Sequence, residues 1–155
     1  MNLDSPKSGG LIAVIGLLDL YGPQNFYPSH LLTAQERYAW GQQKLQAEVS
    51  HQKFRQFFAV HELEAWLLSD PKLFPPVVRN ALTSAAANPE AVNFNQPPAR
   101  LLGKLFREKL KRRYFKPVDG YDLFSKLDPE VAYQKCPRLK ELLDEMLKLA
   151  KACGN

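Results

Sequence analysis

Two stretches along the chain have the hydrophobic pattern of buried β-strands. Residues Leu11–Leu18 form an apolar run of strand length that ends at Asp19, and Phe54–Val60 is rich in aromatic and β-branched residues. Such runs are typical of strands covered on both faces, as in parallel α/β sheets. Between them, Thr33-Ala-Gln-Glu36 has the pattern of a capping box, which predicts a helix that continues to about Val49.

The rest of the chain has the pattern of short helices. His61 closes the second strand, and Glu62–Leu68 is predicted to be a short helix. Asp70 and Pro71 favour a helix start, and Pro75-Pro76 interrupts it, so we expect the helix proper from Pro76 to about Ala87. Four more helices are predicted after the proline-containing loop: Ala99–Arg113, Asp119–Leu127, Pro129–Lys135 capped by Asp128, and Pro137–Ala152 with Gly154 as its stop signal.

Strands that alternate with helices predict an α/β fold, here a partial parallel sheet followed by a mostly helical C-terminal half. At 155 residues the chain fits one domain. We expect a flexible, polar lead-in over residues 1–10 and a single domain over residues 11–152, with its helical part at about residues 71–152. Because two parallel strands are hardly a stable core, either a strand is hidden or a missing neighbour completes the sheet.

Composition adds a basic segment and argues against a membrane span. The net charge is +5, and eight Lys or Arg residues lie between Arg100 and Lys116 against a single acid, Glu108. Such clusters attract polyanions, most commonly nucleic acid, although a solvated helix face has the same composition. The longest apolar run is far shorter than the ~20 residues that a membrane span needs. Two cysteines form neither a disulfide framework nor a zinc motif, so we expect a cytoplasmic chain with no membrane contact.

Acidic residues follow both predicted strands. Asp19 ends the first strand, and His61-Glu62-Leu63-Glu64 follows the second, so parallel strands would bring them to one edge, where α/β sheets bind ligands. Carboxylate oxygens suit a hard cation, which makes Asp19, Glu62 and Glu64 candidate ligands of Mg²⁺ or Mn²⁺. Alternatively, Asp19 only caps a turn. On a helix Glu62 and Glu64 point about 200° apart, so one would bind metal and the other would face the positive helix N-terminus.

His61 has three open roles: metal ligand, general base, or cap of the following helix. A zinc protease is excluded on spacing, because the residue four positions after His61 is Ala65 and not a second histidine. A third candidate group consists of Arg100, Tyr114 and Lys116, since aromatic residues between basic ones can bind a phosphate backbone. Alternatively, Tyr114 and Phe115 simply pack the end of the basic helix.

Several motifs occur together in a recognisable order. They are D-L-Y-G-P (Asp19–Pro23), H-E-L-E-A-W-L-L-S-D-P (His61–Pro71), N-P-E-A-V-N (Asn88–Asn93), P-A-R-L-L (Pro98–Leu102), Y-F-K-P-V-D-G (Tyr114–Gly120) and K-C-P-R-L (Lys135–Leu139). From about Leu11 to Leu149 the chain resembles a bacterial family called domain of unknown function 4276, which is placed among the Toprim-like folds.

The resemblance implies a function in nucleic-acid chemistry. Toprim-like proteins cut or rejoin nucleic acid with a divalent metal, so Asp19 would be the metal-site aspartate, with Glu62 and Glu64 near it. His61, Arg100, Tyr114 and Lys116 would surround the substrate pocket, with Asp19, His61 and Glu62 in catalytic roles. Genes of this family often lie beside ATPase genes in defence loci, which implies an ATPase partner.

The chain departs from the family pattern in two places. No E-G-x-T-E segment precedes Asp19, and this segment carries the glutamate that acts as general acid and base in Toprim chemistry. The usual D-x-D pair is here Asp19-Leu20-Tyr21, with one acid lost. These departures lead us to expect a fragment, a truncated gene or half of a split protein.

Two functions follow from these expectations. The first is a divalent-metal-dependent phosphodiester hydrolase, or a subunit of one, that is inactive until another chain supplies the missing strand and glutamate. A phosphatase of related fold would need the same acids. The alternative is a non-catalytic subunit that binds nucleic acid or an ATPase through the basic helix and the final amphipathic helix.

Overall fold

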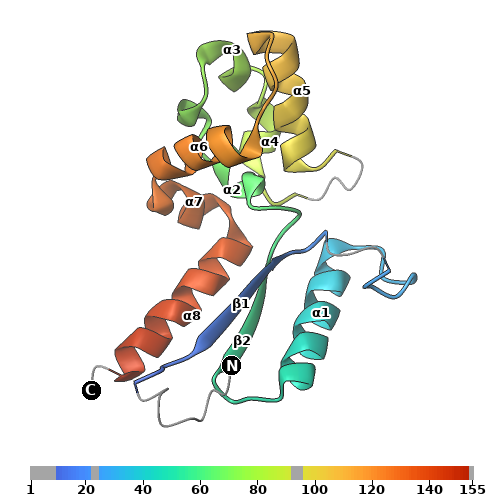
Figure 1. Ribbon diagram of the computed structural model, residues 1–155, viewed down its shortest axis with the longest axis vertical. Coiled ribbons are helices and arrows are strands. Elements are labelled where there is room, and N and C mark those ends of the chain that lie inside the picture. The colour runs from blue at the N-terminus through green and yellow to red at the C-terminus, as the bar shows by residue number, and fades with distance from the viewer. Residues whose placement is uncertain (1–9, 22–24, 92–95, 154–155) are drawn as a thin grey trace.

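A computed structural model of the chain describes residues 10–21, 25–91 and 96–153. Strands β1 (Val14–Asp19) and β2 (Phe54–Ala59) form a two-stranded parallel sheet at one end of the molecule, in which Val14 pairs with Phe54 and Asp19 with Ala59. The short helices that follow β2 form the other end (Figure 1). The expected α/β class, with a partial parallel sheet and a mostly helical C-terminal half, is confirmed.

Helix α1 (Ala34–Val49) covers one face of the sheet, and it begins where the capping box predicts. The Thr33 hydroxyl accepts the Glu36 amide at 3.2 Å, and the Glu36 carboxylate accepts the Thr33 amide at 2.9 Å. Tyr38 of this helix packs in a buried cluster with Phe58 of β2. A Cβ atom at Gly41 would lie 2.9 Å from the Phe58 ring, so this close approach requires glycine.

Helix α8 (Pro137–Cys153) covers the other face. Phe57 points to this side because consecutive strand residues face opposite ways, and it is buried with Cys136, Leu139 and Leu142. The sheet is therefore sandwiched between α8 and α1, as Figure 1 shows. No helix of the described residues is both long and apolar enough to cross a membrane.

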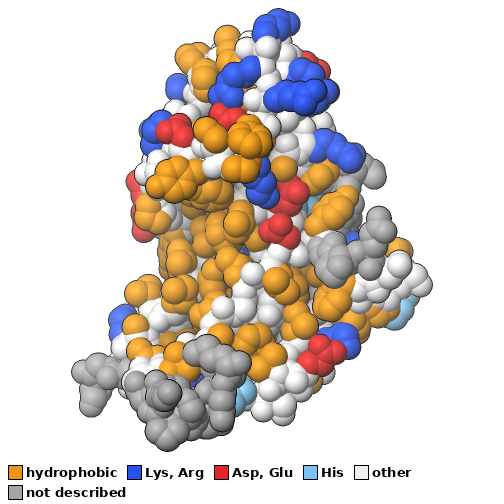
Figure 2. Space-filling model, viewed as in Figure 1, with side chains coloured by type: hydrophobic (Ala, Val, Ile, Leu, Met, Phe, Trp, Pro, Cys, Tyr) orange, Lys and Arg blue, Asp and Glu red, His pale blue; other side chains and the backbone are white. Residues whose placement is uncertain are grey.

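The two outer edges of the sheet differ. On the β2 edge, side-chain amides of α1 replace a strand: Gln42 donates to the Gln56 carbonyl at 2.9 Å, and Gln46 accepts the Gln56 amide at 3.3 Å. On the β1 edge no further strand pairs within the described parts of the chain, and Leu17 and Leu18 are 38% and 51% exposed. Figure 2 shows hydrophobic side chains gathered along the middle of the molecule, between α8 and α1.

The helical end has its own core. Its elements are α2 (Glu64–Leu68), the 3₁₀ turn η2 (Pro71–Leu73), α3 (Pro76–Arg79), α4 (Thr83–Ala87), α5 (Pro98–Leu110), the π-helical turn η3 (Lys116–Gly120), α6 (Tyr121–Lys126) and α7 (Pro129–Lys135). Leu102, Leu105 and Phe106 of α5 are buried there against Leu67, Phe74, Val78 and Leu123. Asp70 caps η2 and Asp128 caps α7, as predicted.

Several predicted helix boundaries are wrong. The helix after β2 begins at Glu64 rather than Glu62, because His61 has a left-handed backbone with φ of 66°. The expected helix from Pro76 to Ala87 is interrupted between α3 and α4, where Asn80 has low helix propensity. Helix α5 ends at Leu110 rather than Arg113, because Lys111 turns into the left-handed region with φ of 55°. The lead-in residues 1–9 and Gly154 lie outside the described residues.

Candidate functional site

The carboxyl ends of β1 and β2 bring three acidic residues together. Asp19 ends β1, and Glu62 and Glu64 follow β2. The parallel pairing therefore places all three at the carboxyl end of the two strands. Each acid interacts electrostatically with another of the three and with the Lys116 ammonium. We call Asp19, Glu62 and Glu64 the acidic cluster. The structure thus brings to one end of the sheet the three acids that the sequence predicts there.

Glu64 is the most deeply placed member of the acidic cluster. Its side chain is fully buried, and its Oε2 accepts the Lys116 ammonium at 3.0 Å, while the Lys116 side chain remains 52% exposed. Burial alone lowers the pKa of Lys116, but the hydrogen bond and charge of Glu64, with the charges of Asp19 and Glu62, raise the pKa above its usual value. Lys116 is therefore a positively charged partner of the acidic cluster.

Glu62 connects the acidic cluster to α5. Since α2 begins only at Glu64, Glu62 precedes that helix, and its Oε2 accepts the amide of Ala99 in the first turn of α5 at 2.9 Å. A carboxylate at this position also interacts favourably with the positive end of the helix dipole. The helix-terminus role expected for one of the two glutamates therefore belongs to Glu62, and the helix is α5 rather than α2.

Burial shifts the protonation of two members of the acidic cluster. Desolvation raises the pKa of Asp19; Lys116 partly offsets this, and the negative charge of Glu64 adds to it. Desolvation likewise raises the pKa of Glu62, opposed by the Ala99 amide and reinforced by Glu64. Carboxyl groups with raised pKa values in a shared cluster are frequent at functional sites, although structural ion-pair networks shift pKa values as well.

Tyr114 is half-buried, and its hydroxyl is turned inward beside Glu64. Its ring packs edge-to-face on Phe106 with centroids 5.1 Å apart, and a Cβ at Gly120 would lie 3.2 Å from its hydroxyl. Desolvation raises the pKa of Tyr114, and the negative charge of Glu64 and a hydrogen bond to Glu64 raise it further. The Tyr114 hydroxyl and Glu64 Oε1 are both buried, and neither makes a hydrogen bond of good distance and angle with a described residue.

Two further predicted site residues lie on the segments that carry the acidic cluster and its partners. His61 is 1% exposed, its pKa is lowered by desolvation, and it bonds to the backbone of Ala91. Arg100 is exposed on the first turn of α5, one residue after the amide that Glu62 accepts.

The acidic cluster fits a hard divalent cation in the type of its donors. Three carboxylates face one ammonium, and the buried Oε1 of Glu64 has no hydrogen bond to a described residue. A ready-made group of three or more His, Cys, Asp or Glu ligands is not found among residues 10–21, 25–91 and 96–153. Mg²⁺ needs only one or two carboxylates and keeps several waters, so such an ion would use one or two of these acids rather than all three.

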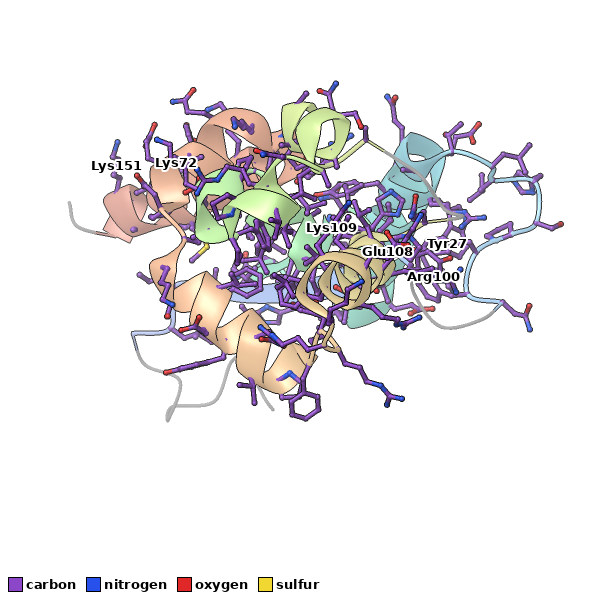
Figure 3. The ribbon with its side chains drawn as sticks, turned by 90° about the horizontal axis from the view of Figure 1, so that it is seen from above. Tyr27, Lys72, Arg100, Glu108, Lys109 and Lys151 are labelled. Atoms are coloured by element: carbon purple, nitrogen blue, oxygen red, sulfur yellow. The ribbon has the colours of Figure 1, made fainter. Side chains whose placement is uncertain are left out.

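A basic hollow lies at the end of α5. Its volume is about 560 Å³, and its described lining consists of Arg107, Lys111, Arg112 and Arg113, with no acid among them. We call it the basic groove. Other cations lie elsewhere: Figure 3 shows Lys72 and Lys151 on the opposite side of the molecule from Arg100. The charge run in the sequence indicated a basic surface, but the left-handed turn at Lys111 that gathers these side chains has no sequence signal.

Comparison with known proteins gives a family but no characterised relative. No curated protein and no solved structure matches the chain. The sequence pattern of one family matches residues 7–147, which is most of the chain. The protein therefore belongs to the family described as domain of unknown function 4276.

Proposed function

We propose that this chain is a subunit of a Toprim-like, divalent-metal-dependent nuclease that acts in the cytoplasm. The observation that carries the proposal is the acidic cluster at the carboxyl edge of a parallel strand pair. This edge is where α/β sheets place their ligand sites. The basic groove supports a polyanionic substrate, because clustered cations attract phosphate, although one of them, Arg112, is itself paired with Asp119.

Each site residue has a role in this proposal. Asp19, Glu62 and Glu64 would hold Mg²⁺ or Mn²⁺, which when bound polarises a phosphodiester and lowers the pKa of a bound water. The half-exposed ammonium of Lys116 is available to a phosphate oxygen from its exposed side. The nearby Tyr114 hydroxyl is positioned by Phe106 and Gly120, and it supports Glu64 rather than contacting substrate.

The open edge of β1 supports a second polypeptide that adds a strand. An apolar groove of about 450 Å³ runs past Leu17 between Trp66 and Leu143, and one of about 330 Å³ runs past Leu18 between Tyr27 and Leu45. Because Leu17 and Leu18 face opposite sides of the sheet, an added apolar strand would fill both grooves. An added strand there would lie beside Asp19, so it could contribute a general acid and base.

Metal binding tests the proposal directly. We expect Mn²⁺ to bind the purified chain, as measured by isothermal titration calorimetry, and Asp19→Ala to weaken binding at least ten-fold because a cluster carboxylate is lost. Asp144→Ala is the matched control, since Asp144 is an exposed aspartate paired with Lys140 on α8. Plasmid and single-stranded substrates are assayed in parallel, and we expect no cleavage by the chain alone.

The outcomes separate the alternatives. Metal-dependent cleavage that Asp19→Ala abolishes would support a nuclease but overturn the need for a second polypeptide. If Mn²⁺ does not bind, or binds Asp19→Ala equally well, the nuclease proposal is wrong. The second candidate would then stand: a non-catalytic subunit that binds nucleic acid or an ATPase. The Lys116–Glu64 pair favours this candidate, because the structure already neutralises one acid internally.

A further inference from the structure

Three exposed apolar side chains follow the basic groove along the chain. They are Phe115, Val118 and Tyr121, exposed by 60%, 61% and 78%. They recur every three residues from Phe115, which precedes the π-helical turn η3, through Val118 to Tyr121 at the start of α6. We call them the aromatic ridge. A contiguous apolar patch on a protein surface is typical of a binding site.

Hydrogen bonds fix the backbone of the aromatic ridge. The Asp119 carboxylate accepts the Phe115 amide at 2.6 Å and pairs with the Arg112 guanidinium at 2.8 Å. The Phe115 carbonyl in turn accepts the amides of Val118 and Asp119 at 3.0 and 2.8 Å. The turn is thus closed by its own contacts, and Phe115 is presented to solvent by an ordered backbone. Pre-organised side chains lose less entropy when a ligand binds.

Charge around the aromatic ridge identifies the class of ligand. Arg112 and Arg113 of the basic groove precede Phe115, and Lys116 follows it; Arg112 also pairs with Asp119 and Lys116 with Glu64. Exposed aromatic rings beside cations are the combination that binds single-stranded nucleic acid, since bases stack on the rings while the backbone follows the cations. A duplex keeps its bases stacked internally, so only the basic groove would contact it.

We propose that the aromatic ridge is a base-stacking platform, and that the ligand of this chain is single-stranded rather than duplex nucleic acid. This inference rests on the nucleic-acid binding of the proposed function and names its substrate class. Phe115 and Tyr121 stack on unpaired bases, and the basic groove holds the adjacent phosphates. Tyr114, which the sequence favours equally, takes no part because its ring and hydroxyl pack inward.

Binding without metal tests the inference separately from catalysis. Fluorescence anisotropy is measured in EDTA with a labelled oligothymidine strand and with a duplex of equal length. We expect tighter binding of the single strand, and about a ten-fold loss for Phe115→Ala and for Tyr121→Ala, since each base–aromatic stack contributes roughly 1–3 kcal/mol. Duplex affinity should change less than about two-fold. Phe115→Trp and Tyr121→Phe should retain binding, whereas Phe115→Leu should not.

Leu147→Ala is the control, because Leu147 is 56% exposed but lies on α8. All substituted side chains are exposed, and an unchanged melting temperature confirms folding. Unchanged single-strand affinity in both alanine variants would overturn the inference and assign the ridge to a protein contact. If Arg113→Glu still weakens binding in that case, the proposed nucleic-acid binding stands. If neither nucleic acid binds, both the inference and the polyanion part of the proposed function fail.

Discussion

The contributions of Asp19 and Asp144 to the stability of the fold should change with pH in opposite directions. The pKa of Asp19 is raised by desolvation, so the folded state holds its proton more tightly than the unfolded state does. The contribution of Asp19 to stability is therefore present at low pH and is lost as pH rises through the folded pKa. Asparagine does not titrate. We expect Asp19→Asn to become more stable relative to the parent chain as pH rises from about 3 to about 7, measured by urea denaturation.

Asp144→Asn should show the reverse trend in the same measurement. Hydrogen bonds from Lys140 and Tyr133 lower the pKa of Asp144, so its contribution is present at neutral pH and is lost as pH falls. The relative stability of this variant should decrease as pH rises. If the relative stabilities of the two variants change with pH in the same direction, Asp19 is not desolvated in the folded chain.

The positions of Asp19, Glu62 and Glu64 at or after the ends of two strands were enough to predict that they lie at the same end of the sheet, because parallel strands have their carboxyl ends on one side. They were not enough to predict the partners. Glu62 reaches the Ala99 amide and Glu64 reaches Lys116 across 37 and 52 residues, and such long-range contacts leave no local pattern. The burial of Tyr114 likewise depends on Phe106 and Gly120 rather than on its immediate neighbours in the sequence.

Among the elements, α1 both covers the sheet and closes one of its edges. Gln42 and Gln46 satisfy the outward carbonyl and amide of Gln56, which would otherwise be unpaired at the edge of β2. Each such hydrogen bond contributes about 1 kcal/mol. We expect Gln42→Ala with Gln46→Ala to lower the free energy of unfolding by about 2 kcal/mol and to accelerate hydrogen exchange of the Gln56 amide.

The neighbouring Gln43 provides the control, because it is an exposed glutamine of the same helix. Gln43→Ala should change the free energy of unfolding by less than about 0.5 kcal/mol and leave the hydrogen-exchange rate of the Gln56 amide unchanged. Equal exchange of Gln56 in both variants would mean that α1 does not close this edge.

Elements with a local signal were predicted well. The Thr33–Glu36 capping box and the Asp128 cap placed α1 and α7, and the apolar runs placed both strands within a few residues. Elements that depend on backbone conformation were not. The left-handed residues His61 and Lys111 end or delay helices without glycine, and the π-helical turn η3 follows from the Asp119 contacts rather than from propensity.

For the whole molecule, the two edges of the sheet offer different surfaces for assembly. The β2 edge is closed by α1, whereas the amides of Ile15, Leu17 and Asp19 point outward, since the alternate residues Val14 and Leu20 donate to the β2 side. An edge that no described residue pairs, between two apolar grooves, is a template for another strand. We therefore expect the chain to associate with itself through this edge as concentration rises.

Sedimentation velocity over a range of protein concentrations measures this association. Leu17→Lys with Leu18→Lys should keep the chain monomeric, because a charge on each face of β1 prevents pairing, while stability changes little at two exposed positions. Val77→Lys is the matched control: Val77 is 52% exposed but lies on α3, in the helical end. If the parent chain is monomeric throughout, or if Val77→Lys suppresses association equally well, the β1 edge is not the assembly surface. The proposed nuclease would then have to acquire its acid and base elsewhere.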